Sequence, residues 1–226
     1  MPALPEPPVL EPKHSATEQR LVLYNVPWDD YEQFCELFAG HNVRLAYQQG
    51  TLEIMPPSMG HEFSSYASGR AIDVLAEEMD VIILPGRSVT LKSEAVERGI
   101  EADNCYWIAN EELVRAKEEI DLDVDPPPDL FVEVEVTRTV LDRLDICSKL
   151  GIPEVWRIEG GEIKILIRDA DGAYSETDES SSFPGFPVKE IAPFLKRKTG
   201  VDYLTHMRQF RDWVRGRLDS NSDSPN

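Results

Sequence analysis

Two pairs of acidic residues stand in extended segments, at a spacing that puts each pair on one face of a strand. Glu133 and Glu135 alternate with valines in DLFVEVEVT, and Glu101 and Asp103 stand in EADNCYWI. Residues two apart on a strand point to the same side and lie roughly 6.5–7 Å apart. One carboxylate from each of two neighbouring strands can hold Mg²⁺, which takes one or two carboxylates plus water. Such a site can activate a bound water and stabilise charge at a phosphate.

The same pairs can also simply face water, as charges on the open face of a sheet usually do. Two features oppose that interpretation. The segment 129–137 stands between a turn and a predicted helix, so its second face is expected to be covered. Like charges side by side also cost stability unless a metal ion or a basic side chain neutralises them. Spacing alone leaves both alternatives open.

The hydrophobic pattern predicts alternating helices and strands. Helices are expected at residues 26–40, 61–80, 110–118, 139–150, 190–198 and 201–216. Strands are expected in hairpins at 43–56 and 154–169, and at 81–85, 88–92, 101–109, 129–137 and 173–180. This order predicts an α/β fold, one mixed β-sheet flanked by helices, with an N-terminal helix-hairpin extension and C-terminal helices. Segments 129–137, 139–150 and 154–159 are expected to form a right-handed β-α-β crossover.

The composition is that of a globular chain. The 226 residues, 41% hydrophobic and 29% charged, suit one well-buried domain with extensions. No stretch has the roughly 18 apolar residues that cross a bilayer, so no membrane association is expected. Cys35, Cys105 and Cys147 are widely spaced and lack C-x-x-C pairs. That usage is typical of the reducing cytoplasm and argues against a disulfide framework or a zinc site.

The formal net charge of −19 is unevenly distributed. Residues 189–217 hold eight Lys or Arg against three Asp or Glu, whereas the preceding 188 residues hold fifteen against thirty-seven. An acidic surface repels nucleic acid, whose binding depends on phosphate contacts. The basic stretch is either a solvated helical face or a phosphate-binding patch. Its apolar residues Phe210, Trp213 and Val214 can pack on their own domain or join two copies in a homodimer.

Four segments are expected along the chain. Residues 1–17 are proline-rich and predicted to be a disordered lead-in rather than a secretory signal. Residues 18–192 are predicted to form one domain, 193–217 a helical extension and 218–226 a disordered tail.

The acidic segments also carry a family resemblance. GIEADNCYWIA, DPPPDLFVEVEVT, LDR and LGIPEVWR, together with LEIMPPSMGHEFSSYASGRAIDVLAEE upstream, resemble the Uma-type putative restriction endonuclease family over roughly residues 40–192. That family belongs to the PD-(D/E)xK nuclease-like superfamily. The resemblance implies a restriction endonuclease-like core, with helices on both sides of a central mixed sheet. It also implies an active site with an Asp at the start of one strand and an acid-x-Lys on the next, binding Mg²⁺.

Carried over to this sequence, the resemblance implies Asp103 and Glu133 as the metal ligands. It matches Glu62, beside His61, to an acidic residue on the family's first core helix. The residues alone instead favour Glu62 as a helix N-terminal acid that is stabilised by the helix dipole.

The sequence departs from the family pattern at the lysine. Glu135 stands where the lysine is expected, two residues after Glu133. The resemblance also implies a lysine on the following helix in many relatives, and the nearest equivalent of that lysine here is Arg143. An arginine can stabilise charge on a phosphate, but its pKa above about 12 keeps it from acting as a base. Lys92 and Lys149 are possible substitutes, and both also fit ordinary surface lysines.

Three functions follow as hypotheses. The first is a Mg²⁺- or Mn²⁺-dependent endonuclease that hydrolyses DNA, with Asp103 and Glu133 holding the metal. Glu135 or Glu62 would complete the shell, and Arg143 or a lysine would stabilise the transition state. The second is a nuclease-fold protein that has lost turnover and acts as a binding or regulatory module. The third is a metal-dependent hydrolase with a substrate other than DNA, which the negative charge would tolerate better.

Overall fold

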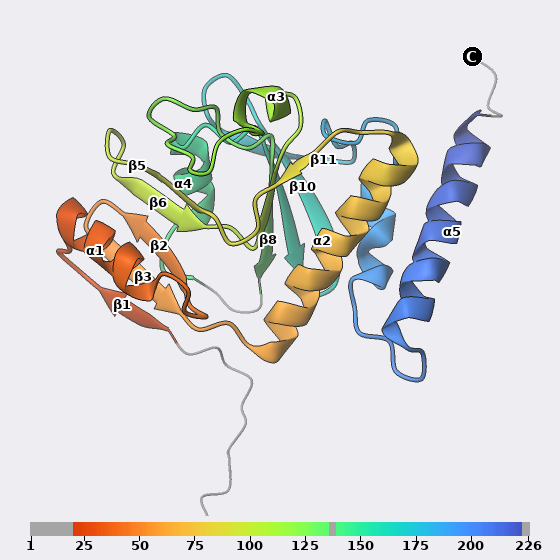
Figure 1. Ribbon diagram of the computed structural model, residues 1–226, viewed down its shortest axis with the longest axis horizontal. Helices are drawn as coiled ribbons and strands as arrows, with labels where there is room; N and C mark the ends of the chain where they lie inside the picture. Colours follow the sequence, from red (N-terminus) through yellow and green to blue (C-terminus); the bar gives the residue numbers. More distant parts are fainter. Residues whose placement is uncertain (1–19, 136–138, 223–226) are drawn as a thin grey trace, which may run out of the picture.

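The computed structural model describes residues 20–135 and 139–222, and these form a mixed α/β architecture with helices on both sides of the strands (Figure 1). The five-stranded sheet has the order β1-β3-β2-β6-β5 and is antiparallel at every pair. Its strands are β1 (Leu21–Leu23), β2 (Arg44–Gln48), β3 (Thr51–Met55), β5 (Thr90–Ser93) and β6 (Arg98–Glu101).

The six-stranded sheet has the order β11-β10-β9-β8-β7-β4. Its strands are β4 (Leu84–Pro85), β7 (Asn104–Trp107), β8 (Leu130–Glu135), β9 (Glu154–Glu159), β10 (Glu162–Arg168) and β11 (Tyr174–Thr177). Strands β8 and β9 are parallel, and the other pairs are antiparallel. A parallel pair needs a crossover connection, and here it contains α4 (Arg143–Lys149). The expected β-α-β unit is therefore confirmed.

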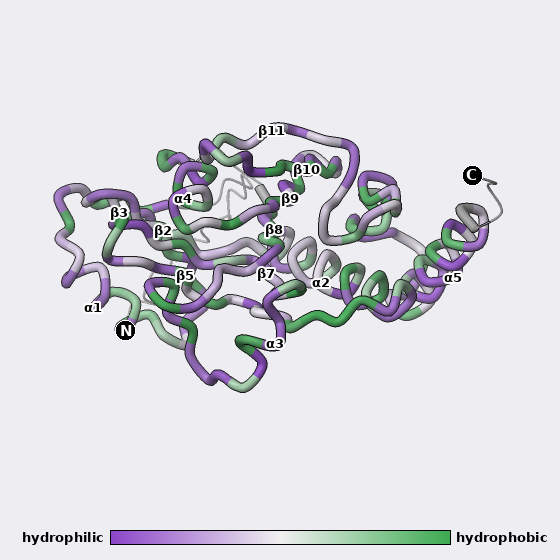
Figure 2. The backbone as a smooth tube through the Cα atoms, turned by 90° about the horizontal axis from the view of Figure 1, so that it is seen from above, coloured by the Kyte–Doolittle hydropathy of each residue, from purple (hydrophilic) through white to green (hydrophobic). Residues whose placement is uncertain are grey.

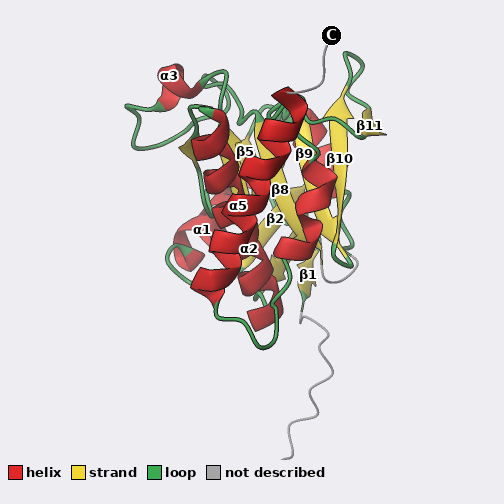
Figure 3. Cartoon of the chain, turned by 90° about the vertical axis from the view of Figure 1, so that its right-hand side faces the viewer, coloured by secondary structure: helices red, strands yellow, loops and turns green. Residues whose placement is uncertain are grey.

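The remaining helical elements are α1 (Trp28–Phe38), α2 (Met59–Met79), α3 (Glu111–Val114), the 3₁₀ helix η1 (Val188–Phe194) and α5 (Tyr203–Ser222). Figure 3 shows α2 and α5 side by side in front of the six-stranded sheet. Helix α1 instead packs on the five-stranded sheet, where Tyr31 stacks on Tyr47 with ring centroids 4.6 Å apart.

The expectation of a single sheet was wrong. The segment 101–109 divides into β6 and β7, which belong to different sheets. The chain steps from one sheet to the other at Ala102 and Asp103, and both residues are buried. An alternating pattern reports burial on two faces, but it cannot report a change of partner strand inside one run.

Several helix boundaries also differ from expectation, and α3 ends at Val114 rather than at 118. Helix α4 begins at Arg143 rather than at 139, because Asp142 caps it and accepts a 3.1 Å hydrogen bond from the Asp145 amide. The element expected at 190–198 is η1, which ends at Phe194 and contains Pro193. Proline has no N–H to donate, so it cannot extend an α-helical ladder there. Helix α5 continues to Ser222, so residues 218–222 are helical where a disordered tail was expected.

Strand β8 is covered on both faces. Leu130, Val132 and Val134 lie in the core that contains α2, η1 and α5. Phe131, on the opposite face, lies in a second core formed by α4 and the five-stranded sheet. Glu133 shares that second face because side chains alternate along a strand. The interpretation that this acid lies on an open, wet face is therefore excluded.

Helix α5 is amphipathic, and Figure 2 shows it striped with hydrophobic and hydrophilic positions. Phe210 and Val214 are fully buried against the rest of the chain, and Trp213 packs against Phe186 and Phe194. The apolar face considered for a homodimer is thus covered by the protein's own core. No helix in residues 20–135 and 139–222 is long and apolar enough to cross a membrane.

Candidate functional site

Asp103 lies at the step between the two sheets, directly before β7. Its side chain is 5% exposed, and its Oδ2 accepts a 2.8 Å hydrogen bond from the Val134 amide of β8. The following residue holds this corner in place, because the Asn104 amide group donates to the carbonyl oxygen of Ser65 at 2.8 Å and to the Ser68 hydroxyl at 3.2 Å. Strand β7 and helix α2 together therefore determine where the Asp103 carboxylate points.

Glu133 lies in the middle of β8, and it is 4% exposed. Asn104 pairs with Val132 in the antiparallel register of β7 and β8, so the next positions outward are Asp103 and Glu133. Asp103 and Glu133 therefore occupy neighbouring positions across the β7–β8 pairing.

Two guanidinium groups contact the Glu133 carboxylate. Arg143 Nη1 from α4 lies 3.0 Å from Oε1, and Arg157 Nε from β9 lies 3.4 Å from Oε2. Arg157 is directly opposite Glu133 in the parallel register. Arg143, the residue considered in place of the lysine, thus lies beside Glu133, whereas Arg157 was not anticipated.

Glu62 does not contact Asp103. Its neighbour His61 does, with Nε2 3.2 Å from Asp103 Oδ2, and His61 is 1% exposed. The side chain of Glu62 is 39% exposed and is linked to Asp103 only through Arg44, which lies 3.7 Å from Glu62 Oε1 and 3.6 Å from Asp103 Oδ1. Ser58 caps α2 and accepts a hydrogen bond from the His61 amide, so the first turn of α2 presents His61 to the site.

Glu53 of β3 is an acid of the site that sequence reasoning missed. It is 1% exposed, and Arg143 Nη2 lies 3.5 Å from its Oε1. The Thr139 hydroxyl and the Val140 amide donate to the same carboxylate at 2.9 and 3.1 Å. The sequence TLEIM carries a signal for this residue, because an acid between apolar residues of a strand needs a partner when the strand is buried.

The site is therefore a network in which acids and guanidinium groups alternate, and Glu53, Asp103 and Glu133 are its buried acids. Its members are Glu53, Glu62, Asp103 and Glu133, with Arg20, Arg44, Arg143, Arg157 and His61. Burial raises the pKa of Asp103, but the hydrogen bond and charge of His61, the Val134 amide and the charge of Arg143 outweigh it and leave that pKa lowered. Burial also acts to lower the pKa of Arg143, yet the charges of Glu133, Glu53 and Asp103 raise it. Both groups are accordingly ionised at neutral pH.

The lysines considered as substitutes lie elsewhere. Lys92 pairs with Glu32 at 2.5 Å, and Lys149 is exposed at the end of α4. In the part of the chain that the structure describes, no lysine is paired with Asp103 or Glu133. Glu135 is the last residue of β8, and its side chain lies outside the described part.

The donor set limits which metal the site can hold. Within the described residues, no three His, Cys, Asp or Glu side chains gather at a metal-binding spacing. Asp103 and Glu133 thus offer two carboxylates, which suits a hard cation that keeps several waters, as Mg²⁺ does. It does not suit a structural zinc site, which needs four protein ligands.

The family model described as "Uma2: Putative restriction endonuclease" matches residues 28–193. The chain belongs to this Uma2 family. No match was found among curated proteins. Among solved structures, the chain is similar to a protein described as a putative nuclease belonging to DUF820 from Anabaena variabilis. That likeness has a TM-score of 0.43 and 17% identity, and it covers 75% of this chain and 90% of the other.

Proposed function

We propose that this protein is an endonuclease that hydrolyses phosphodiester bonds of DNA with Mg²⁺ or Mn²⁺ held by Asp103 and Glu133. One observation carries the proposal. The buried residues Asp103, directly before β7, and Glu133, in β8, stand at neighbouring positions, and the Asp103 carboxylate accepts a 2.8 Å hydrogen bond from the Val134 amide. Membership of a family described as putative restriction endonucleases supports it.

The bound cation would supply a water of lowered pKa and stabilise charge on the phosphate. The residues of this chain would do the rest. His61, 3.2 Å from Asp103, holds that carboxylate in its orientation. Arg143 brings a permanent positive charge to Glu133, and a guanidinium suits a phosphate oxygen as well as a carboxylate. Because Arg143 does not deprotonate, it would stabilise charge rather than remove a proton.

A second candidate is a weakened nuclease-fold protein that serves as a binding or regulatory module. The observation that favours it is that Arg143 and Arg157 already neutralise Glu133. Buried ion pairs of this kind can serve structure alone. All three cysteines are free thiols, which suits the cytoplasm as the compartment for either candidate.

The two candidates differ in turnover. The test is cleavage of supercoiled plasmid in the presence of Mg²⁺ or Mn²⁺ by the natural chain, Asp103→Asn and Glu133→Gln. The matched control is Glu154→Gln, which alters an equally buried acid that bonds Ser182 and Trp156 outside the network. The endonuclease proposal expects cleavage by the natural chain and the control and loss of cleavage in both site variants. Cleavage by either site variant at the natural rate would contradict it, and no cleavage by any chain would favour the second candidate.

A further inference from the structure

The basic C-terminal segment, residues 189–217, contains two groups of cations in different environments. Arg211 and Arg215 pair with Glu78 of α2 at 3.1 and 2.8 Å, and Arg217 pairs with Glu190 of η1. These arginines attach α5 to the body of the protein, so their charge is already compensated.

The second part is the run Lys196-Arg197-Lys198 between η1 and α5. All three side chains are exposed, and none forms an ion pair with any residue in 20–135 or 139–222. Three adjacent cations without a counter-charge are unusual in a chain with a formal net charge of −19. They repel one another unless an anion lies between them.

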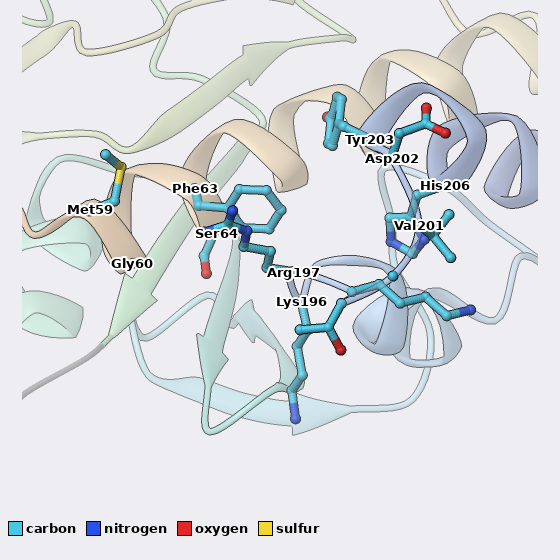
Figure 4. A pocket seen from close by; sticks show the side chains of 13 residues that line it. Met59, Gly60, Phe63, Ser64, Lys196, Arg197, Val201, Asp202, Tyr203 and His206 are labelled. Carbon is cyan, nitrogen blue, oxygen red and sulfur yellow. The ribbon is translucent and has the colours of Figure 1, made fainter.

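This run borders a hollow of about 1150 Å³, which we call the basic hollow (Figure 4). Its walls come from the loop 196–202, from the first turns of α2 with Phe63 and Ser64, and from the start of α5 with Tyr203 and His206. Tyr203 Oη and His206 Nδ1 have no hydrogen-bond partner among the described residues, although both atoms are buried.

Asp202 is the acidic residue on this wall, and its carboxylate is already engaged. It caps α5 by accepting from the Thr205 amide at 2.9 Å and from the Thr205 hydroxyl at 2.7 Å. Three cations and this one carboxylate line the hollow, so positive charge is in excess there.

The basic hollow and the acidic site share one turn of helix α2. His61 points to Asp103, whereas Met59, Gly60, Phe63 and Ser64 line the hollow. The loop also lies beside the turn between β9 and β10, because a Cβ at Gly161 would meet the Lys196 side chain at 1.6 Å. Gly161 lies in the turn that follows β9, and β9 runs parallel to β8, which carries Glu133.

We propose that the basic hollow binds the phosphate backbone of DNA beside the acidic site. This inference rests on the proposed endonuclease function, and it gives the acidic protein its grip on the substrate. Lys196, Arg197 and Lys198 would contact phosphates, and Phe63 and Tyr203 would contact sugars or bases. The basic run lies beyond residue 193, where the family match ends, whereas the α2 wall of the hollow lies within that match.

The test measures binding of a fluorescent DNA duplex by anisotropy over a series of salt concentrations, with EDTA present so that no cleavage occurs. The natural chain is compared with the triple variant Lys196→Ala, Arg197→Ala, Lys198→Ala. Arg197→Ala removes one charge of the run, and Lys149→Ala is its matched control. Both residues are exposed and unpaired within the described part.

The proposal expects the triple variant to bind on the order of tenfold more weakly and to lose about two to three units of the salt slope, one for each phosphate contact. Arg197→Ala should weaken binding, and Lys149→Ala should not. Natural affinity in the triple variant, equal losses in the two single variants, or no DNA binding by the natural chain would each overturn it.

The cleavage assay separates this proposal from the endonuclease function. Natural cleavage together with unaltered binding by the triple variant would overturn the basic hollow alone. Duplex binding that depends on the triple lysine-arginine run, without any cleavage, would support the hollow and count against the endonuclease. The assignment to DNA would be overturned if an RNA duplex bound more tightly than DNA and bound the triple variant as well as the natural chain.

Discussion

Arg143 Nη1 lies 3.0 Å from Glu133 Oε1, and Nη2 of the same guanidinium lies 3.5 Å from Glu53 Oε1. One cation on α4 therefore joins an acid of the six-stranded sheet to an acid of the five-stranded sheet. Arg143 stands near the position at which the family pattern carries a lysine. A guanidinium there keeps the positive charge at any accessible pH, but it cannot exchange a proton.

The first prediction concerns the stability that depends on Arg143. Arg143→Met should lower the free energy of unfolding by about 3–5 kcal/mol, because it leaves Glu133 and Glu53 buried with less compensation. Urea denaturation measures the change. Adding Glu53→Gln should recover part of the loss, since the two residues are in contact. A loss below about 0.5 kcal/mol would show that Arg143 is not a structural link.

The second prediction separates His61 from Glu62. His61→Ala should slow DNA cleavage by about 10–100-fold, the usual cost of removing a group that orients a metal ligand. Glu62→Gln should change the rate little, because Glu62 reaches Asp103 only through Arg44. Mn²⁺ affinity should fall with the rate in His61→Ala, and a purely structural role would leave that affinity unchanged. Equal rate losses in the two variants would contradict the assignment.

The third prediction concerns Glu101, at the end of β6. Burial raises the pKa of Glu101 to about 7, from an ordinary value of 4.5, although the charge of Arg44 opposes the rise. The folded state then holds the proton more tightly than the unfolded state, so stability decreases as the pH rises from about 4.5 to 7. Glu101→Gln removes this ionisation, and it should stabilise the protein at pH 8 by on the order of 1–3 kcal/mol, with little effect near pH 4.

Thermal or urea unfolding at the two pH values measures that difference. Glu94→Gln is the control, because Glu94 is an exposed acid in the connection between β5 and β6. A gain for Glu101→Gln that is the same at both pH values would contradict a raised pKa.

The fourth prediction uses two glycines with opposite surroundings. A Cβ at Gly99 would lie 2.1 Å from Tyr31 Oη, and Tyr31 is fully buried. Gly99→Ala should therefore cost about 1–3 kcal/mol through overpacking. Gly216 is exposed within α5 with nothing within 4 Å, so Gly216→Ala should stabilise by about 0.5–1 kcal/mol. Calorimetric unfolding of both variants checks the signs, and a stabilising Gly99→Ala would contradict the packing described for α1.

Much of the fold was predictable because local patterns report local structure. The Gly160-Gly161 turn and the helical spacing of 61–80 match the elements observed, and the alternation in 129–137 matches β8 as far as Glu135, since residues 136–137 lie outside the described residues. The division into two sheets was not predictable, because partner choice depends on contacts far apart in the sequence.

The candidate site divides in the same way. Asp103 and Glu133 were found from strand spacing and family resemblance, and Arg143 from its place after β8. Glu53 was missed because its partner Arg143 lies 90 residues away. His61 was passed over in favour of Glu62, since a helical sequence alone does not show which of two adjacent residues faces a neighbouring strand.

The central claim is that Asp103 and Glu133 together hold a divalent cation. Calorimetric titration of Mn²⁺ and Mg²⁺ into the natural chain, Asp103→Ala and Glu133→Ala tests it most directly, with Glu154→Gln as the control for altering a buried acid. The account predicts binding by the natural chain and the control, and loss of binding in both site variants. Absence of binding by the natural chain at millimolar metal, or undiminished binding in either site variant, would contradict it.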